Sequence, residues 1–203
     1  MDTNQELNRF YTGTKEMMKR IKAVTVMSSM LNTVLAASLA VVGYFSVQEA
    51  QAQETLATIT EEDRHCLQQN IYFEARNQTV AGQVAVAWVT LNRVVSPDFP
   101  DTVCDVVKQG RRDANGNMLR NQCQFSWYCD GLSDRIPDNV VSQRAWEDAQ
   151  LVADVVLLDW AYGRISPVDV ATFYHADYVN PYWANHFVQV AVIDDHIFYV
   201  DES

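Results

Sequence analysis

The sequence predicts an α+β domain that is mainly helical, carries a small antiparallel sheet near its C-terminus and follows an N-terminal apolar helix. Three segments combine apolar residues at helical spacing with capping residues at their ends: 61–76, 80–95 and 142–162. Two β-type runs, 187–193 and 196–200, flank Asp194-Asp195, which is typical of a hairpin. An uncharged run from residue 23 to residue 47 is long enough to span a bilayer.

Residues 1–52 are predicted to be a cytoplasmic leader followed by a membrane-targeting helix. Basic residues before the run 23–47 keep the N-terminus in the cytoplasm and send the rest of the chain across the inner membrane. Ala50-Gln51-Ala52 has the pattern of a signal-peptidase site. The run is therefore either a cleaved signal peptide, which leaves a secreted or periplasmic domain, or a retained signal anchor that holds the chain to the membrane. A buried core helix is the third alternative.

The composition indicates one globular domain with an appendage. The chain has 203 residues, of which 48% are hydrophobic and 20% charged. Its formal net charge is −11, and most of the acidic residues follow residue 52. This balance argues against nucleic acid or an anionic membrane surface as a partner.

All four cysteines lie in the exported part: Cys66, Cys104, Cys123 and Cys129. An even number in an exported protein favours two disulfides. Zinc binding is the competing interpretation, but there is no Cys-x-x-Cys pair and the histidines are scattered, so we expect no metal and no cofactor. Of the three possible connectivities we favour Cys123 with Cys129, which closes a short loop, and Cys66 with Cys104, which ties the first helix to a later one.

The catalytic domain is expected at 63–203, after a linker at 53–62. Thr60 followed by Asp63 is a helix N-cap pattern, so a first helix begins there and continues to about residue 76. Thr79 then caps a helix over 80–95 that is apolar nearly all round, which predicts a central buried helix with Gln83 as a polar exception.

The middle of the chain is more polar. Asp101 is expected to cap a short helix that carries several valines. Residues 110–122 are predicted to form a polar loop with Asn115-Gly116 at its tip. The long helix 142–162 ends at Gly163, and 171–176 is expected to be a short strand.

Glu74 is the candidate catalytic residue. In the first helix it lies at i+7 from Leu67 and i+3 from Ile71, so the carboxyl shares a stripe with core residues. Burial disfavours the charged form of a carboxyl and raises its pKa, which suits a general acid. The alternative is that Glu74 ends the helix and forms an ion pair with Arg76 or another arginine.

The segment 123–131 contains too many aromatic residues for a solvated loop. Held by a disulfide, it is expected to present Gln124, Ser126 and Trp127 to an extended ligand, such as a sugar chain. The alternative is a small aromatic cluster that seals the core.

Several ordered motifs between residues 64 and 200 support a resemblance to a known family: 70–76 (NIYFEAR), 82–87 (GQVAVA), 91–94 (LNRV), 99–104 (FPDTVC), 123–127 (CQFSW), 173–176 (FYHA) and 196–199 (HIFY). They resemble the cell-wall hydrolase family of spore cortex-lytic (SleB-type) enzymes. The resemblance implies a lysozyme-like α+β fold that acts on the glycan strands of peptidoglycan, with Glu74 as the catalytic acid. Asn77 and Asp194 stand where the family usually has Gly, and both residues are compatible with the same backbone geometry.

No second carboxylate stands out in the motifs beside Glu74. We therefore expect a lytic transglycosylase that cleaves after N-acetylmuramic acid and leaves 1,6-anhydro ends. Asp130 and Asp177 are the candidates for a second carboxylate, which a hydrolytic mechanism requires. The remaining alternatives are an N-acetylmuramoyl amidase, a Cys–His peptidase and a non-catalytic wall-binding module. The residues expected to bind the substrate are Gln83, Gln124, Phe125, Ser126, Trp127, Tyr174 and His175.

Overall fold

The computed structural model describes residues 43–202. The chain divides into two units, Met1–Ala50 and Gln51–Ser203, and the second contains every element discussed below. Most of the apolar run 23–47 lies outside the described residues, so its role as a signal or anchor stays a prediction. Within the described part, no helix is both long and apolar enough to cross a membrane.

The segment expected to be a linker is instead ordered and packed. Residues 51–58 are helical, Ala52 is buried, and Leu56 and Ile59 lie against the hydrophobic core. Residues 52, 56 and 59 follow one another at i, i+4 and i+7, which places them on one helix face. The part of the expected linker before Thr60 therefore belongs to the domain that follows it.

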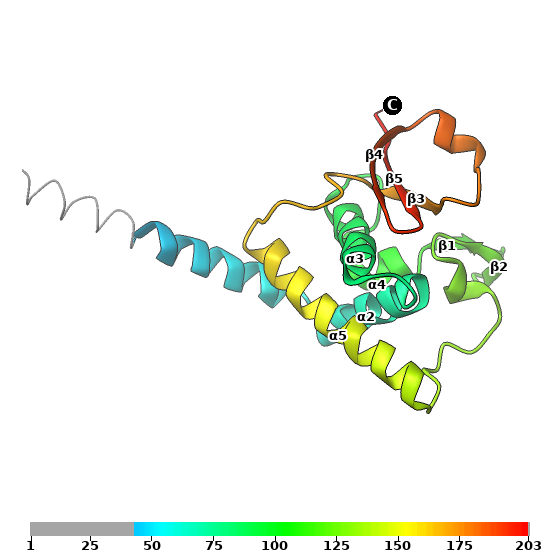
Figure 1. Ribbon diagram of the computed structural model, residues 1–203, viewed down its shortest axis with the longest axis horizontal. Helices are drawn as coiled ribbons and strands as arrows, with labels where there is room; N and C mark the ends of the chain where they lie inside the picture. Colours follow the sequence, from blue (N-terminus) through cyan, green and yellow to red (C-terminus); the bar gives the residue numbers. More distant parts are fainter. Residues whose placement is uncertain (1–42, 203) are drawn as a thin grey trace, which may run out of the picture. The chain divides into compact units, whose positions relative to one another are not determined.

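Four helices form the body of the domain (Figure 1). They are α2 (Glu61–Ala75), α3 (Val80–Val95), α4 (Val103–Val107) and α5 (Val140–Ala161). Thr60 and Asp63 form a capping box at the start of α2, as predicted. The α4 cap is Thr102 rather than Asp101, because it is the Thr102 hydroxyl that accepts from the Asp105 backbone N–H.

The core lies between these helices, with α3 at its centre as its apolar sequence predicts. Ala85, Val86 and Val89 of α3 are fully buried. α5 covers one side of this core with a row of buried residues that includes Ala149 and Val156, and it ends before Gly163. The predicted disulfide Cys66–Cys104 is present and joins α2 to α4.

A three-stranded antiparallel sheet packs on the helical body near the C-terminus. It consists of β3 (Phe173–Ala176), β4 (Val188–Ile193) and β5 (His196–Val200) in the order β3-β5-β4, with the short 3-10 helix η2 (Tyr182–Asn185) between β3 and β4. Asp194-Asp195 forms the turn between β4 and β5, as predicted. Phe198 of the central strand is fully buried and belongs to the core.

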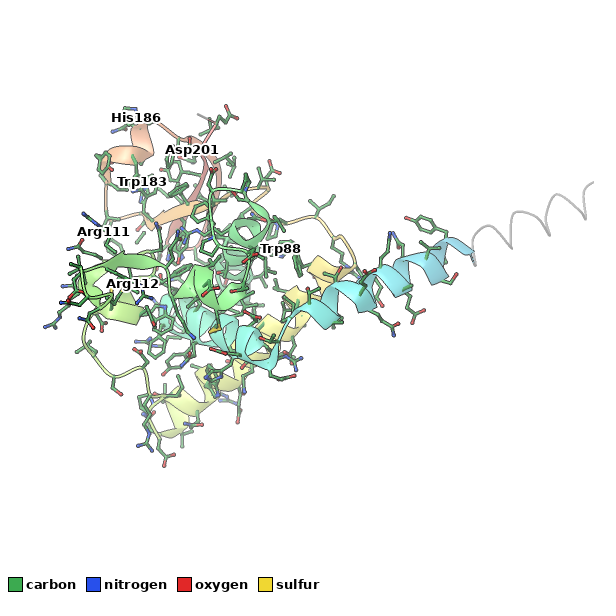
Figure 2. The ribbon with its side chains drawn as sticks, turned by 180° about the vertical axis from the view of Figure 1, so that it is seen from behind. Trp88, Arg111, Arg112, Trp183, His186 and Asp201 are labelled. Carbon is green, nitrogen blue, oxygen red and sulfur yellow. A yellow bond between two sulfur atoms is a disulfide. The ribbon has the colours of Figure 1, made fainter. Side chains whose placement is uncertain are left out.

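The expected polar loop at 110–122 is a two-stranded hairpin. β1 (Gly110–Arg112) pairs with β2 (Met118–Cys123), and Gly116 at the tip has φ +84°. Both faces of this hairpin are largely solvated, so its strands lack the apolar alternation that identifies a half-buried strand. Arg111 and Arg112 lie on its exposed edge (Figure 2). The second predicted disulfide, Cys123–Cys129, links β2 to the 3-10 helix η1 (Ser126–Cys129).

The β4–β5 turn is fastened to the N-terminus of α3. Oδ2 of Asp194 accepts hydrogen bonds from the Thr79 backbone N–H at 2.9 Å and from the Thr79 hydroxyl at 2.7 Å. A carboxylate is favourable there because the first N–H groups of a helix have no partners within the helix. Asp194 approaches so closely that a Cβ on Gly82 would lie 2.5 Å from its Oδ2. Asp195 adds a reciprocal pair of hydrogen bonds with the Gln78 side chain.

Candidate active site

A cavity of about 620 Å³ lies where α2, the segment 124–134 and β3 meet, and we call it the Glu74 cavity. Six of the residues predicted from the sequence line it: Glu74, Gln124, Ser126, Trp127, Tyr174 and His175. They come from three parts of the chain that are distant in sequence. The fold therefore brings together the carboxyl, the aromatic segment and the first sheet strand.

Glu74 lies in the last turn of α2, with its carboxyl at the cavity. The Tyr174 hydroxyl donates a 2.8 Å hydrogen bond to its Oε2. Burial raises the pKa of Glu74, while the hydrogen bond from Tyr174 and the positive charge of Arg93 oppose that rise. No ion pair joins Glu74 to Arg76 in the described residues, although Arg76 lies near the same cavity. The carboxyl is thus placed as a proton donor would be.

Arg93 of α3 is a buried cation in the lining of the same cavity. It is 4% exposed, and its Nε donates a 2.7 Å hydrogen bond to the Thr172 carbonyl. The guanidinium carbon lies 5.1 Å from the centre of the Phe99 ring and 4.9 Å from that of Phe125. Burial lowers its pKa to about 10, so it stays charged at neutral pH. Its Nη1 is buried and has no hydrogen-bond partner in the described residues.

His175 is held in one orientation beside Tyr174. Its Nδ1 lies 2.9 Å from the Ala176 carbonyl, and its Nε2 lies 3.0 Å from the Tyr199 hydroxyl. A carbonyl only accepts, so Nδ1 carries the proton; in the neutral ring Nε2 then accepts from Tyr199. The imidazole also stacks on the Tyr199 ring with centroids 5.2 Å apart. This contact fixes the sheet side of the cavity.

Trp127 is mostly buried, and a polar chain within the core sets its position. Its indole N–H donates to Oδ1 of Asn70 at 3.0 Å, and the Asn70 amide donates to the Thr90 hydroxyl at 3.0 Å. The indole stacks on Phe73 with centroids 4.7 Å apart. Trp127 lines the cavity and also belongs to the hydrophobic core. It therefore fits both the predicted binding residue and the alternative of an aromatic cluster that seals the core.

Two aspartates of the segment 124–134 lie at the cavity. Asp130 and Asp134 both line it, and burial together with the charge of Asp130 raises the pKa of Asp134. Asp177, the other expected second carboxylate, is not in the lining. Its backbone N–H donates to the Asp195 carbonyl just beyond the end of β3.

Gln83 and Phe125 do not line the Glu74 cavity, contrary to expectation. The Gln83 amide is buried near the start of α3 and faces the Gln78 carbonyl at 3.4 Å. Phe125 is fully buried beneath Arg93. Its backbone is extended, so it points away from the side that Gln124 and Ser126 share.

The lining residues that the predicted site lacks include Arg93, Asp134 and His196. Arg93 carried a usable signal, because a lone arginine in a helix that is apolar nearly all round implies a buried anion or a site. Asp134 and His196 carried none, since only the path of the loop and the sheet register bring them to the cavity.

The cysteine positions bear on two of the alternatives, a Cys–His peptidase and a zinc site. All four cysteines of the chain are in disulfides, so no thiol is free to act as a peptidase nucleophile. In the described part of the chain, the cluster with metal-ligand spacing is Glu62 with Cys66 and Cys104, and these two sulfurs are bonded to each other.

Comparison with known proteins gives consistent matches. The family model described as Cell Wall Hydrolase matches residues 77–199, a segment that begins three residues after Glu74. A spore cortex-lytic enzyme of Halalkalibacterium halodurans is 44% identical over 57 residues, which are 28% of this chain and 17% of that enzyme. A spore cortex-lytic enzyme of Bacillus subtilis is 42% identical over 60 residues, 30% of this chain and 20% of that enzyme. The matched segments thus span at most one fifth of these curated relatives.

The catalytic domain of the Bacillus cereus SleB protein is 27% identical, with a TM-score of 0.48 over 70% of this chain and 92% of that domain. The catalytic domain of the germination-specific lytic transglycosylase SleB of Bacillus anthracis gives the same identity and TM-score over 70% of this chain and 96% of that domain. The family model covers more than half of the 203 residues. The chain therefore belongs to the cell wall hydrolase family, as its resemblance to the spore cortex-lytic enzymes predicted.

Proposed function

We propose that this chain cleaves peptidoglycan glycan strands between N-acetylmuramic acid and N-acetylglucosamine as a lytic transglycosylase, with Glu74 as general acid and then general base. The observation that carries the proposal is the placement of the Glu74 carboxyl: it lies at a large cavity, burial raises its pKa, and a neutral donor, Tyr174, contacts it. The family membership supports peptidoglycan as the substrate.

In the proposed reaction, protonated Glu74 gives its proton to the oxygen that bridges the two sugars. The bond from that oxygen to C1 of the muramic residue breaks, and the residue's own 6-hydroxyl attacks C1. Glu74, now a carboxylate, takes the proton from this hydroxyl. No water is consumed, and the hydroxyl is already held within the bound sugar, which gives it a high effective concentration. Arg93 and Tyr174 stabilise the carboxylate during the interval in which it is charged.

Hydrolysis is the second candidate, because Asp130 and Asp134 line the same cavity. A carboxylate there, placed across the bound sugar from Glu74, would activate a water for attack at C1. The residue to change is Asp134, whose raised pKa reflects burial and the neighbouring Asp130.

Mass analysis of the muropeptides released from purified sacculi tests the proposal. The full chain should release fragments with 1,6-anhydromuramic ends, which are lighter by one water than reducing ends. The matched Glu74→Gln variant keeps the volume of the side chain without an acidic proton, and it should release nothing. If the full chain instead releases reducing muramic ends, and Asp134→Asn no longer releases them, the reaction is hydrolysis. Reducing N-acetylglucosamine ends would show that another bond is cleaved.

We also place this reaction outside the cytoplasmic membrane, where disulfides such as Cys66–Cys104 and Cys123–Cys129 form and persist. The run 23–47 then acts as a cleaved signal or as an anchor. Fractionation of cells that express the full chain, with the N-terminus of the mature protein sequenced, distinguishes these two fates.

A further inference from the structure

The β1–β2 hairpin carries positive charge on an acidic domain. After residue 52 the chain has 10 basic and 22 acidic residues, and the hairpin at 110–123 contains three of the basic residues but only one of the acidic ones. The three basic residues, Arg111, Arg112 and Arg120, are all exposed, and the first two are labelled in Figure 2. Within the described residues none of the three forms an ion pair with a carboxylate. The hairpin is therefore a cationic surface that an anionic partner can neutralise.

The one carboxylate of the hairpin, Asp113, is engaged by the tip and not by the arginines. Its Oδ1 accepts hydrogen bonds from the backbone N–H groups of Asn115 at 2.9 Å and Asn117 at 2.8 Å. Its Oδ2 accepts one from the Asn117 side-chain amide at 3.1 Å. Nη1 of Arg112 donates to the Gly116 carbonyl at 3.0 Å. The tip is thus held by its own hydrogen bonds, so a ligand that binds there need not first order the chain.

The β1–β2 hairpin lies beside the Glu74 cavity. Nε of Arg120 donates a 2.8 Å hydrogen bond to the backbone carbonyl of Asp130, and Asp130 is a lining residue of the cavity. The Cys123–Cys129 disulfide joins β2 to the segment 124–134, which supplies further lining residues. Groups that project from a glycan strand bound at Glu74 can therefore reach the hairpin.

The charge pattern and the open edge of β1 favour a peptide over a continuous polyanion. An arginine guanidinium binds a carboxylate through two parallel hydrogen bonds. Asp113 and the negative charge of the domain repel a long phosphate polymer, whereas a peptide brings only a few discrete carboxylates. In the described part of the chain β1 pairs with β2 alone, so its other edge has no strand partner. An extended peptide can add to such an edge through its backbone.

We propose that the β1–β2 hairpin binds the peptides attached to the muramic residues, with Arg111 and Arg112 paired to the free carboxylates of those peptides. This inference rests on the proposed function, because it is the glycan at Glu74 that brings the peptides to the hairpin. Its consequence is a preference among strands. The chain binds strands with charged peptide carboxylates more tightly than strands on which these groups are neutral.

The test measures cosedimentation of the full chain with sacculi, in the Glu74→Gln variant so that no strand is cleaved. The sacculi are first freed of phosphate polymers with hydrofluoric acid. One portion is then amidated with carbodiimide and ammonia, which turns carboxylates into neutral amides and leaves glycan and peptides in place. The Kd on unamidated sacculi should be roughly three- to tenfold lower than on amidated ones, as expected for two exposed carboxylate pairs. Salt should reduce this difference, since it screens exposed charges.

Two double variants locate the effect. Arg111→Gln with Arg112→Gln should bind unamidated sacculi only as tightly as its parent binds amidated ones, and amidation should then have no further effect. Arg111→Lys with Arg112→Lys keeps both charges and should retain most of the difference. The matched control is Arg144→Gln with Arg164→Gln, which also removes two exposed charges, outside the hairpin, and it should bind like the parent.

Three results would overturn the proposal. Amidation that weakens the glutamine double variant as much as its parent would place the carboxylate contact elsewhere. Amidation without any effect would show that the carboxylates are not bound. Binding that is lost when the phosphate polymers are removed would show that the partner is such a polymer and not the peptide.

Cleavage separates this inference from the proposed function. If binding depends on the carboxylates and on the two arginines, but the wild type releases no fragments from sacculi, the proposed reaction fails and the hairpin site stands. If the wild type cleaves the strands and binding depends on neither, the hairpin site fails and the reaction stands.

Discussion

The hydroxyl of Tyr174 donates a 2.8 Å hydrogen bond to Oε2 of Glu74, although the two residues are 100 positions apart in the sequence. This contact joins the end of α2 to the first strand of the sheet. Burial of Tyr174 and the negative charge of Glu74 raise the pKa of Tyr174 well above its usual value, so the phenol remains a donor across the working pH range. The direction of the hydrogen bond is therefore fixed, and it favours the ionised form of Glu74.

The variant Tyr174→Phe should move the basic limb of the pH profile of kcat/KM upward. A general acid works while it is protonated, so activity falls as pH rises through the pKa of Glu74. The Tyr174 hydrogen bond lowers the pKa of Glu74, so its loss raises this pKa further. Tyr178→Phe is the control, since Tyr178 lies near the same cavity without a hydrogen bond to Glu74. A limb that stays in place or moves downward would contradict the role given to Tyr174.

Arg93 should act on the same limb through its charge. Arg93→Met removes the cation that lowers the pKa of Glu74, so the basic limb should move upward. Arg93→Lys keeps a positive charge at this position, so the basic limb of its kcat/KM profile should lie close to that of the wild type. Because Arg93 is buried, circular dichroism must first show that both variants fold. Loss of activity at every pH with an unmoved limb would mean that Arg93 only supports the structure.

The two disulfides should differ in their contribution to stability. Cys66–Cys104 closes a loop of 38 residues and Cys123–Cys129 one of 6 residues. In the chain-entropy model the longer loop gives about 4 kcal/mol and the shorter about 2 kcal/mol. Urea unfolding of the double alanine variants of each pair measures the two losses. A larger loss of unfolding free energy on removal of Cys123–Cys129 would contradict this prediction. It would show that the entropy of the unfolded chain does not decide which disulfide contributes more.

His196 should make stability fall in mild acid. It is 7% exposed, burial lowers its pKa, and the nearby charges of Asp177, Asp194 and Asp195 only partly offset this effect. The unfolded chain then binds more protons than the folded chain below pH 6.5, so the free energy of unfolding falls as pH falls through 6.5. Urea midpoints at mildly alkaline and mildly acidic pH should differ less in His196→Gln than in the wild type. His186→Gln, at an exposed position, should behave like the wild type.

Local signals predicted most of the fold. The caps at Thr60 and Thr79 located the starts of α2 and α3, and the Asp194-Asp195 turn located the last hairpin. The hairpin β1–β2 was missed because neither face is buried, which leaves no alternation in the sequence. The sequence before Thr60 resembles a linker because its few apolar residues are separated by polar ones, and only packing against the core reveals their common face.

The site was predictable where a residue's direction followed from its own element. Glu74 shares the core stripe of α2, and Gln124 and Ser126 alternate with the buried Phe125. The same alternation would have excluded Phe125 from the cavity. The direction of Gln83 had no such signal, since a helix that is apolar nearly all round has no polar face to point it. Asp134 depends on the path of a loop, which periodicity does not encode.

The fastening of the β4–β5 turn to α3 makes the residue at position 82 depend on the residue at position 194. Alanine at position 82 would favour the helix by about 1 kcal/mol over glycine through helix propensity. Its methyl group would, however, lie 2.5 Å from Oδ2 of Asp194. The same methyl group would lie 2.9 Å from Cβ of Gln78, so an alanine at position 82 requires both the Asp194 carboxylate that holds Thr79 and the Gln78 side chain to move. The glycine thus gives up helix propensity so that the turn can lie close to α3.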